Sequence, residues 1–285
     1  MARLTTRAPA RARPSGFTLA LRFAVVGYLL LLIVWPLVLV VTHTFDGGLD
    51  AMRAVFSDPG TVAALQLSVV AAFAATVINL VFGVGVSLLL VRTEFPGKRA
   101  VSALIDLPLA VSPVVVGLAL MLVYSGRTGW FGPALESAGF RVIFSTPGIV
   151  MATAFVALPL VVREVVPVLK EIGVEQEQAA ASLGASGWQT FWRITLPSIR
   201  WAVVYGVVLT LARSLGEFGA VKVVSGNVLG ETRTATLAVE EKYLNFDQQG
   251  AFAIAFLLAS VSVLAILIVS LLRSRGENLA RKAQS

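Results

Sequence analysis

The sequence predicts an all-α, polytopic membrane protein with six transmembrane helices. Of its 285 residues, 57% are hydrophobic and 14% are charged, whereas a soluble globular protein has roughly 25% charged residues. A helix that crosses a bilayer needs about 20 mostly apolar residues. Six segments meet this requirement, at approximately 20–42, 61–91, 100–124, 147–170, 201–224 and 250–272.

The first apolar segment differs in kind from the others. It follows "RAPARARPSG" and resembles a signal peptide, but its apolar run is too long and no small-x-small cleavage site follows. It is rich in Leu and Val, whereas the second to fifth segments are rich in Ala, Gly and Ser, which allow close helix packing in lipid. We therefore expect an uncleaved accessory helix within 1–60, a core over 61–272, and a tail over 273–285.

Lysine and arginine residues indicate the orientation of the chain. Sixteen of them fall on one side of a six-span arrangement: Arg3, Arg7, Arg11, Arg13, Arg22, Arg92, Lys98, Arg99, Arg163, Lys170, Arg193, Arg200, Arg273, Arg275, Arg281 and Lys282. The other side carries six. Positive loops remain in the cytoplasm, so both termini and the 173–200 region are predicted to be cytoplasmic. This topology explains the net charge of +7 without a nucleic-acid partner.

The polar stretch "GVEQEQAAASLG" between two spans predicts a short helix. Glu175 and Glu177 lie in its first turns, where carboxylates favour the positive end of the helix dipole. Three strong helix formers with little side chain follow, Ala179, Ala180 and Ala181, and Gly184 suits a C-terminal cap. A small knob of this kind carries no catalytic group and suits insertion into a groove on a partner. The alternative is an ordinary interfacial loop.

A second short helix is predicted for "GWQTFWRITLP". Trp188, Phe191, Trp192 and Thr195 recur at i, i+3, i+4 and i+7, which places them on one helical face. Aromatic side chains favour the membrane–water interface, so we expect the three aromatic residues to anchor the loop there. Pro197 is predicted to break this helix before the next span.

These residues carry a resemblance to the membrane subunits of type I ABC importers. The pattern E-A-A-x3-G-x9-I-x-L-P is present with both spacings met, as Gln178, Ala179, Ala180, Gly184, Ile194, Leu196 and Pro197. The departure is Gln178, where the family has Glu. The resemblance covers about 60–272 and implies that this loop docks on a cytoplasmic ATPase subunit. The departure at Gln178 argues against a specific ionic role for the first position, so we expect docking to rest on the shape of the loop more than on that one charge.

Two further segments resemble the permeases of sulfate/thiosulfate importers, especially the W-type subunit. They are "LPLVVREVVPVLKE" and "ARSLGEFGAVKVVSGNVLGETRTATLAVEEKY". Molybdate and tungstate permeases share "LGEFGA" and remain the alternative, whereas "VVSGN…GET" favours sulfate. The resemblance implies a sister permease in a heterodimer, two copies of an ABC ATPase, an extracytoplasmic sulfate-binding protein, and a location in the cytoplasmic (inner) membrane.

The sequence predicts a transport subunit and not an enzyme. No G-x4-G-K-[ST] loop occurs, so ATP and Mg²⁺ are expected on the partner ATPase and no cofactor on this chain. His43 is the one histidine and no cysteine is present, which leaves no credible catalytic triad or metal site. An ion-driven secondary transporter is the remaining alternative from a different class.

Ionisable residues within the spans are candidates for an anion pathway, because a charge in the bilayer usually faces a partner or water. Arg213 and Glu217 are four residues apart in the fifth predicted span, and Asp106 lies in the third. Arg213 would attract a dianion and Glu217 would limit how tightly it is held. The alternative for Arg213 and Glu217 is that they only neutralise one another and stabilise the helix bundle. The alternative for Asp106 is that it is a capped residue at a helix kink.

Three other polar residues are assigned structural roles. Asn79 is predicted to form an interhelical hydrogen bond. Arg163 and Glu164 are predicted to form a solvated pair near the cytoplasmic end of the fourth span.

Overall fold

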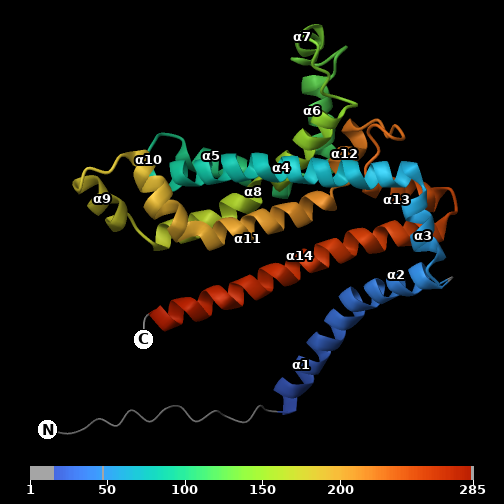
Figure 1. Ribbon diagram of the computed structural model, residues 1–285, viewed down its shortest axis with the longest axis horizontal. Helices are drawn as coiled ribbons and strands as arrows, with labels where there is room; N and C mark the ends of the chain where they lie inside the picture. Colours follow the sequence, from blue (N-terminus) through green and yellow to red (C-terminus); the bar gives the residue numbers. More distant parts are fainter. Residues whose placement is uncertain (1–15, 47, 284–285) are drawn as a thin grey trace.

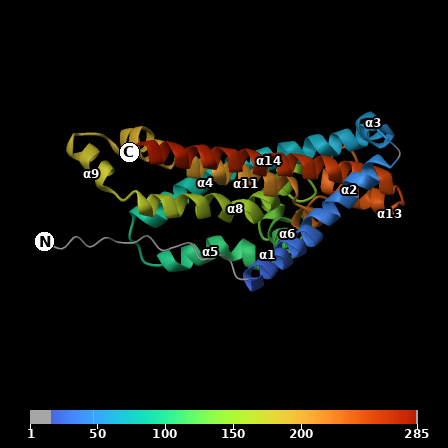
Figure 2. The same cartoon turned by 90° about the horizontal axis from the view of Figure 1, so that it is seen from below.

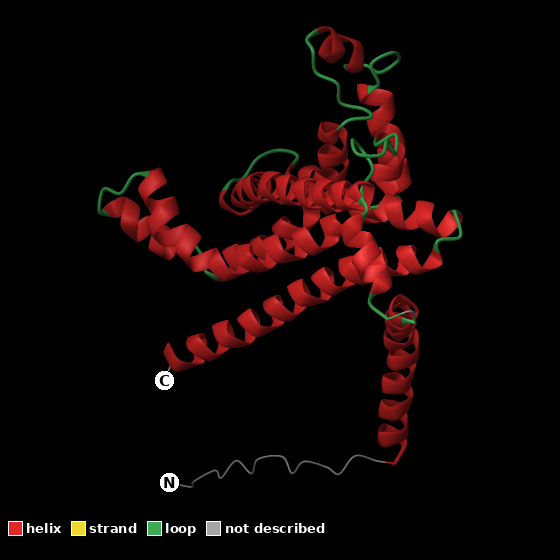
Figure 3. Ribbon diagram, turned by 45° about the vertical axis from the view of Figure 1, so that its right-hand side comes forward, coloured by secondary structure: helices red, strands yellow, loops and turns green. Residues whose placement is uncertain are grey.

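The computed structural model describes residues 16–46 and 48–283, and within these ranges every regular element is a helix (Figures 1 and 3). Arg3, Arg7, Arg11 and Arg13 lie outside the described residues. The elements are α1 (Gly16–Leu29), the π-helix η1 (Leu30–Val34), α2 (Trp35–Phe45), α3 (Asp50–Ser57), α4 (Pro59–Arg92), α5 (Lys98–Ala110), α6 (Pro113–Tyr124), α7 (Gly132–Ser137), α8 (Thr146–Glu171), α9 (Glu175–Ser182), α10 (Gly187–Thr190), the π-helix η2 (Phe191–Thr195), α11 (Leu196–Leu215), α12 (Gly219–Val224), α13 (Ala235–Leu244) and α14 (Gln248–Ala283).

The centre of the molecule is a bundle of α4, α8 and α11, with α14 alongside α11 (Figures 1 and 2). A Cβ added to Gly83 of α4 would lie 2.8 Å from the Cβ of Val161 in α8. A Cβ added to Gly206 of α11 would lie 3.0 Å from the Cα of the same valine. Small residues therefore bring three backbones together around Val161, as the composition predicted. The Asn79 amide donates a 3.0 Å hydrogen bond to the Ala154 carbonyl, which is the predicted interhelical bond.

The first span is set apart from the core, and its accessory role stays a prediction. It is formed by α1, η1 and α2, and it contacts the rest of the chain mainly where α2 meets α14 (Figure 1). Large apolar side chains are exposed along it, for example Phe23 at 70% and Leu31 at 69%. His43 lies in the last turn of α2, and its ring stacks on Phe252 of α14.

The third predicted span, 100–124, is not one kinked helix. Two helices, α5 and α6, meet at an angle of 114°. Pro108 lies inside α5 and Pro113 begins α6, and a proline disfavours helical geometry in the residue before it. Ser112 accordingly has an extended ψ of 134°, and its side chain makes no capping hydrogen bond to α6.

The fifth predicted span begins and ends earlier in the sequence than expected. α11 ends at Leu215, and 219–224 form the separate helix α12, which packs on α6. At this contact a Cβ on Gly117 would lie 2.7 Å from the Ala220 carbonyl oxygen. Within the described residues, five helices are long and apolar enough to cross a membrane, and the number is six if the bent pair α5–α6 is counted as one span.

The close approach of α4 and α8 predicts opposite responses to alanine at two positions of one helix. Gly83→Ala should destabilise the protein by about 1–3 kcal/mol, the usual cost of adding a methyl group to a packed interior. Gly85→Ala meets no atom within 4 Å and should leave the thermal midpoint unchanged or slightly higher. Thermal unfolding in detergent measures both, and equal responses would contradict the contact.

Candidate functional site

The stretch predicted to dock on a partner forms α9, at one end of the bundle (Figures 1 and 2). The C-terminal part of α14 points to the same end, whereas α3 and α13 lie at the opposite end. Gln178, Ala179 and Gly184 are exposed and Ala180 is buried. Leu183 is 89% exposed, so the small knob carries one projecting leucine in addition to its alanines.

A Schellman motif ends α9 at Gly184. The Gly184 N–H donates to the Ala181 carbonyl and the Ala185 N–H donates to the Ala180 carbonyl, each at 3.0 Å. Gly184 has φ +85° and open space around its Cα, so glycine is required by backbone conformation and not by crowding. The cap was predicted, but the exposure of Leu183 was not. Its position directly before a C-cap glycine, where the chain turns outward, is the signal that could have revealed it.

The second predicted helix is present as α10 and continues through η2 into α11. Ser186 and Gln189 form a capping box at its start. Trp188 and Trp192 are 71% and 50% exposed, and their rings meet edge to face with centroids 5.5 Å apart. Phe191 is half-buried against both. The exposed indoles are compatible with the predicted membrane-interface anchor, which stays a prediction.

Two predictions about this helix are wrong, for a common reason. The helix does not break at Pro197, and Thr195 is not on the exposed aromatic face but is buried at 3%. The wider turn of η2, in which the Leu196 N–H donates to the Phe191 carbonyl, shifts the helical period. Pro197 has no N–H to contribute and follows this turn within an uninterrupted helix. Ile194 and Leu196 are half-buried and Pro197 is exposed.

The buried Thr195 is one of four groups that meet at the base of α9. Its hydroxyl donates to the Glu177 carboxylate at 2.8 Å. Arg92, the last residue of α4, has its Nε 2.9 Å from Glu177 Oε2, and its Nη2 donates to Oε1 at 3.2 Å. The Arg92 Nη1 also donates to the Leu169 carbonyl of α8 at 3.1 Å. We call this cluster, Arg92, Glu177, Thr195 and the Leu169 carbonyl, the clip.

Arg213 and Glu217 form an ion pair with 2.7 Å between Nη1 and Oε2. Glu217 follows α11 rather than lying on it, and its Oε1 accepts from the Ala220 N–H in the first turn of α12. The Glu217 side chain is 3% exposed, whereas that of Arg213 is 41% exposed. The carboxylate is therefore fixed between two helices, and the guanidinium is held at the surface of the chain.

Asp106 belongs to a different ion pair. Its carboxylate accepts from the Arg163 Nε at 3.0 Å, and both side chains are about half exposed. The predicted pairing of Arg163 with Glu164 is wrong, because the α5–α8 contact gives Arg163 a partner 57 positions away in the sequence. The three residues predicted for an anion pathway thus occupy two separate pairs and do not form one site.

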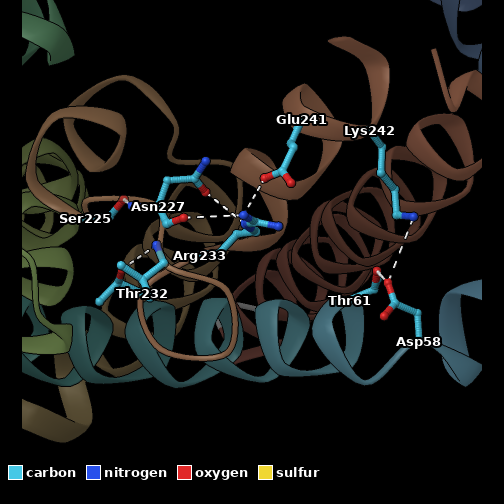
Figure 4. A network of polar contacts seen from close by, with 9 residues as sticks. Asp58, Thr61, Ser225, Asn227, Thr232, Arg233, Glu241 and Lys242 are labelled. Carbon is cyan, nitrogen blue, oxygen red and sulfur yellow. Dashed lines mark hydrogen bonds and ion pairs between the residues drawn. The ribbon is translucent and has the colours of Figure 1, made fainter. Parts of the chain in front are cut away.

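At the opposite end of the bundle, the 225–234 loop is held by its own polar groups (Figure 4). The Arg233 Nε donates to the Asn227 side-chain oxygen at 3.0 Å, and its Nη2 lies 2.6 Å from Glu241 Oε2. The Thr232 hydroxyl accepts from the Val228 N–H at 3.0 Å. Much of the "VVSGN…GET" pattern is therefore explained by a tightly folded loop rather than by an exposed binding group.

A second polar group at this end is centred on Lys242 (Figure 4). Its Nζ lies 2.9 Å from Asp247 and 4.0 Å from Asp58. Hydrogen bonds from the Thr61 hydroxyl and from Lys242 hold the pKa values of Asp58 and Asp247, respectively, below their usual range. Both carboxylates are ionised at neutral pH and tie the start of α4 to the α13–α14 turn. Among the described residues, no group of three His, Cys, Asp or Glu side chains could hold a metal ion.

Comparison with known proteins places these features in a family. The model of the family described as "Binding-protein-dependent transport system inner membrane component" matches residues 79–277. This range contains α9 and the clip, as well as both ion pairs discussed above.

Two curated relatives come from the same organism, Synechocystis sp. The "Sulfate transport system permease protein CysW" is 45% identical over 248 residues, which is 87% of this chain and 90% of the relative. The "Sulfate transport system permease protein CysT" is 36% identical over 253 residues, 89% of this chain and 88% of that protein.

Solved structures agree with this fold. A chain from the "Crystal structure of a bacterial ABC transporter involved in the import of the acidic polysaccharide alginate" superposes with a TM-score of 0.73 at 18% identity. The match covers 92% of this chain and 95% of that one. At this level of identity the likeness concerns the fold alone.

Proposed function

Because this chain belongs to the family of binding-protein-dependent transport system inner membrane components, we propose that it is a membrane-spanning permease subunit of an ATP-driven importer of sulfate and thiosulfate. The observation that carries the proposal is its similarity, over most of both chains, to the sulfate permease CysW. Molybdate and tungstate are the alternative substrates, and the curated relatives do not favour them. An ion-driven mechanism is also disfavoured, because the family works with binding proteins.

The same similarity supports the proposed assembly. One organism has two distinct relatives of this chain, CysW and CysT, each described as a permease of a sulfate transport system. We expect this chain to pair with such a sister permease in a heterodimer, with two copies of a cytoplasmic ATPase and with an extracytoplasmic sulfate-binding protein. ATP and Mg²⁺ would be bound by the ATPase, and this chain would bind no cofactor.

The proposed orientation puts α9 and both termini in the cytoplasm. Eleven of the sixteen basic residues predicted for that side follow Arg22 in the sequence, and positively charged loops remain in the cytoplasm. α9 would dock on the ATPase through its small side chains and Leu183. Closure of the ATPases on ATP would then move α9 and rock the spans from an inward-facing to an outward-facing state.

The exposed side chain of Arg213, which pairs with the buried Glu217, supports a role for Arg213 in the anion pathway. A cation that faced lipid would be costly, so the 41% exposed guanidinium is expected to face the pore between two permease chains. Glu217, fixed by the Ala220 N–H, reduces the net charge of the site. Arg213 would then attract a dianion without trapping it. Asp106, already paired with Arg163, is the weaker candidate.

The direct test of the function is uptake of labelled sulfate by cells lacking this chain, with and without the gene restored. Uptake should depend on the chain, and thiosulfate should compete while molybdate in equal excess should not. Competition by molybdate and not by thiosulfate would instead indicate that this chain is a molybdate permease. Sulfate uptake that is independent of the chain would refute it.

Neutralising Arg213 tests the anion pathway, provided that the buried Glu217 is not left unpaired. Arg213→Gln and the double variant Arg213→Gln/Glu217→Gln should both assemble, the second without a stranded charge. We expect sulfate uptake to fall by about tenfold or more in both, because the attraction for the anion is lost. Recovery of uptake in the double variant would show instead that the pair only locks the bundle. Arg53→Gln, which changes an exposed arginine of α3, is the matched control.

A further inference from the structure

The carboxylate at the base of α9 has partners on two other elements, and one of these partners also contacts a third. Glu177 on α9 receives hydrogen bonds from Arg92 at the end of α4 and from Thr195 in η2. Arg92 in turn donates to the Leu169 carbonyl near the end of α8. The chain positions involved are 77, 85 and 18 residues apart, so the clip joins segments that the sequence does not hold together.

The ion pair of the clip is more buried than the pair that lies closest to it in the sequence. The Arg92 and Glu177 side chains are 16% and 20% exposed, whereas Glu94, paired with Lys98 near the same end of α4, is 89% exposed. Exposed pairs contribute little to stability because water and salt screen them. A largely buried ion pair with further hydrogen bonds holds its two side chains in a fixed geometry. A displacement of one helix is therefore passed to the helix that carries the partner.

The backbone on either side of α9 allows this helix to tilt, so the fixed geometry of the clip matters for its orientation. Gly173 and Gly184, both with positive φ, lie before and after the helix. Through Gly173 α9 is joined to α8, and through the 184–186 turn it is joined to α10. A helix between two glycine turns can tilt relative to its neighbours. The clip supplies a lateral tie that the backbone lacks, and it connects α9 to α4 and to the start of α11 in addition to α8.

The neighbouring Gln178 does not share this role. It is exposed, whereas Glu177 is turned inward. The first position of the docking pattern therefore belongs to the outer surface of α9, and the charge that matters for its orientation lies one residue earlier.

We propose that Glu177, through the clip, is a positioning residue that converts movement of α9 into joint movement of α4, α8 and α11. This inference rests on the proposed function, since it names the element that passes force from the ATPase to the spans. Thr195 is the contact to α11 in this scheme, which gives the π-turn of η2 a function: it turns the Thr195 hydroxyl toward the carboxylate.

The test uses the complete importer, purified and reconstituted in proteoliposomes with its binding protein, and measures sulfate uptake per ATP hydrolysed. Two variants avoid a stranded charge: Arg92→Gln/Glu177→Gln, which removes both charges, and Thr195→Val, which removes one hydrogen bond at nearly constant volume. Both should retain ATPase activity. Uptake per ATP should fall about tenfold in the double variant, in the usual range for coupling between two sites, and by a smaller factor in Thr195→Val.

Glu94→Gln, which changes an exposed glutamate near the same end of α4, is the matched control and should keep the wild-type ratio. A wild-type ratio in the double variant would overturn the inference. If that variant fails to assemble, Thr195→Val decides, and an unchanged ratio there would overturn it equally. Failure of the proposed function is a separate outcome, because the wild-type importer would then take up no sulfate at all.

Discussion

The structure depends on the close contact between α4 and α8 at the glycines that surround Val161. Because Gly83 and Gly206 have no side chains, the backbones of three spans approach within a van der Waals distance of one residue. This contact fixes the relative height of α4 and α8 along the bundle. Arg92, the last residue of α4, consequently reaches the Leu169 carbonyl of α8. The clip that holds α9 therefore follows from packing far from α9 itself.

Helix breaks interrupt two of the predicted spans. One break lies between α5 and α6, the other precedes the short helix α12, and α6 packs on α12. Interrupted helices are tolerated at membrane depth where neighbours satisfy the freed backbone groups. Glu217 does this directly, since its carboxylate accepts from the Ala220 N–H and pairs with Arg213. The charged pair and the helix break are thus parts of one arrangement, which places a guanidinium at the surface of the chain.

Most of the fold could be predicted from composition and local pattern, but the polar contacts between spans could not. Hydropathy located the spans, and the alanine run with Gly184 located α9 and its cap, because both signals are local. The partners of Arg163 and Glu177 lie 57 and 85 residues away, and their identity depends on how helices align. The π-turn before Pro197 changed the helical period, so the position of Thr195 was predicted on the wrong face. The 114° break at Val111–Ser112 was expected only as a kink, since two prolines do not specify an angle.

The central claim, that α9 is the surface that meets the ATPase, can be tested by cross-linking. The chain has no cysteine, so Leu183→Cys introduces a single thiol at a side-chain position that is 89% exposed. Leu229→Cys, at the opposite end of the bundle and 58% exposed, is the control. With a short thiol-reactive cross-linker applied to the assembled importer, we expect a covalent product with the ATPase from position 183 and none from position 229. No product from position 183, or equal products from both, would contradict it.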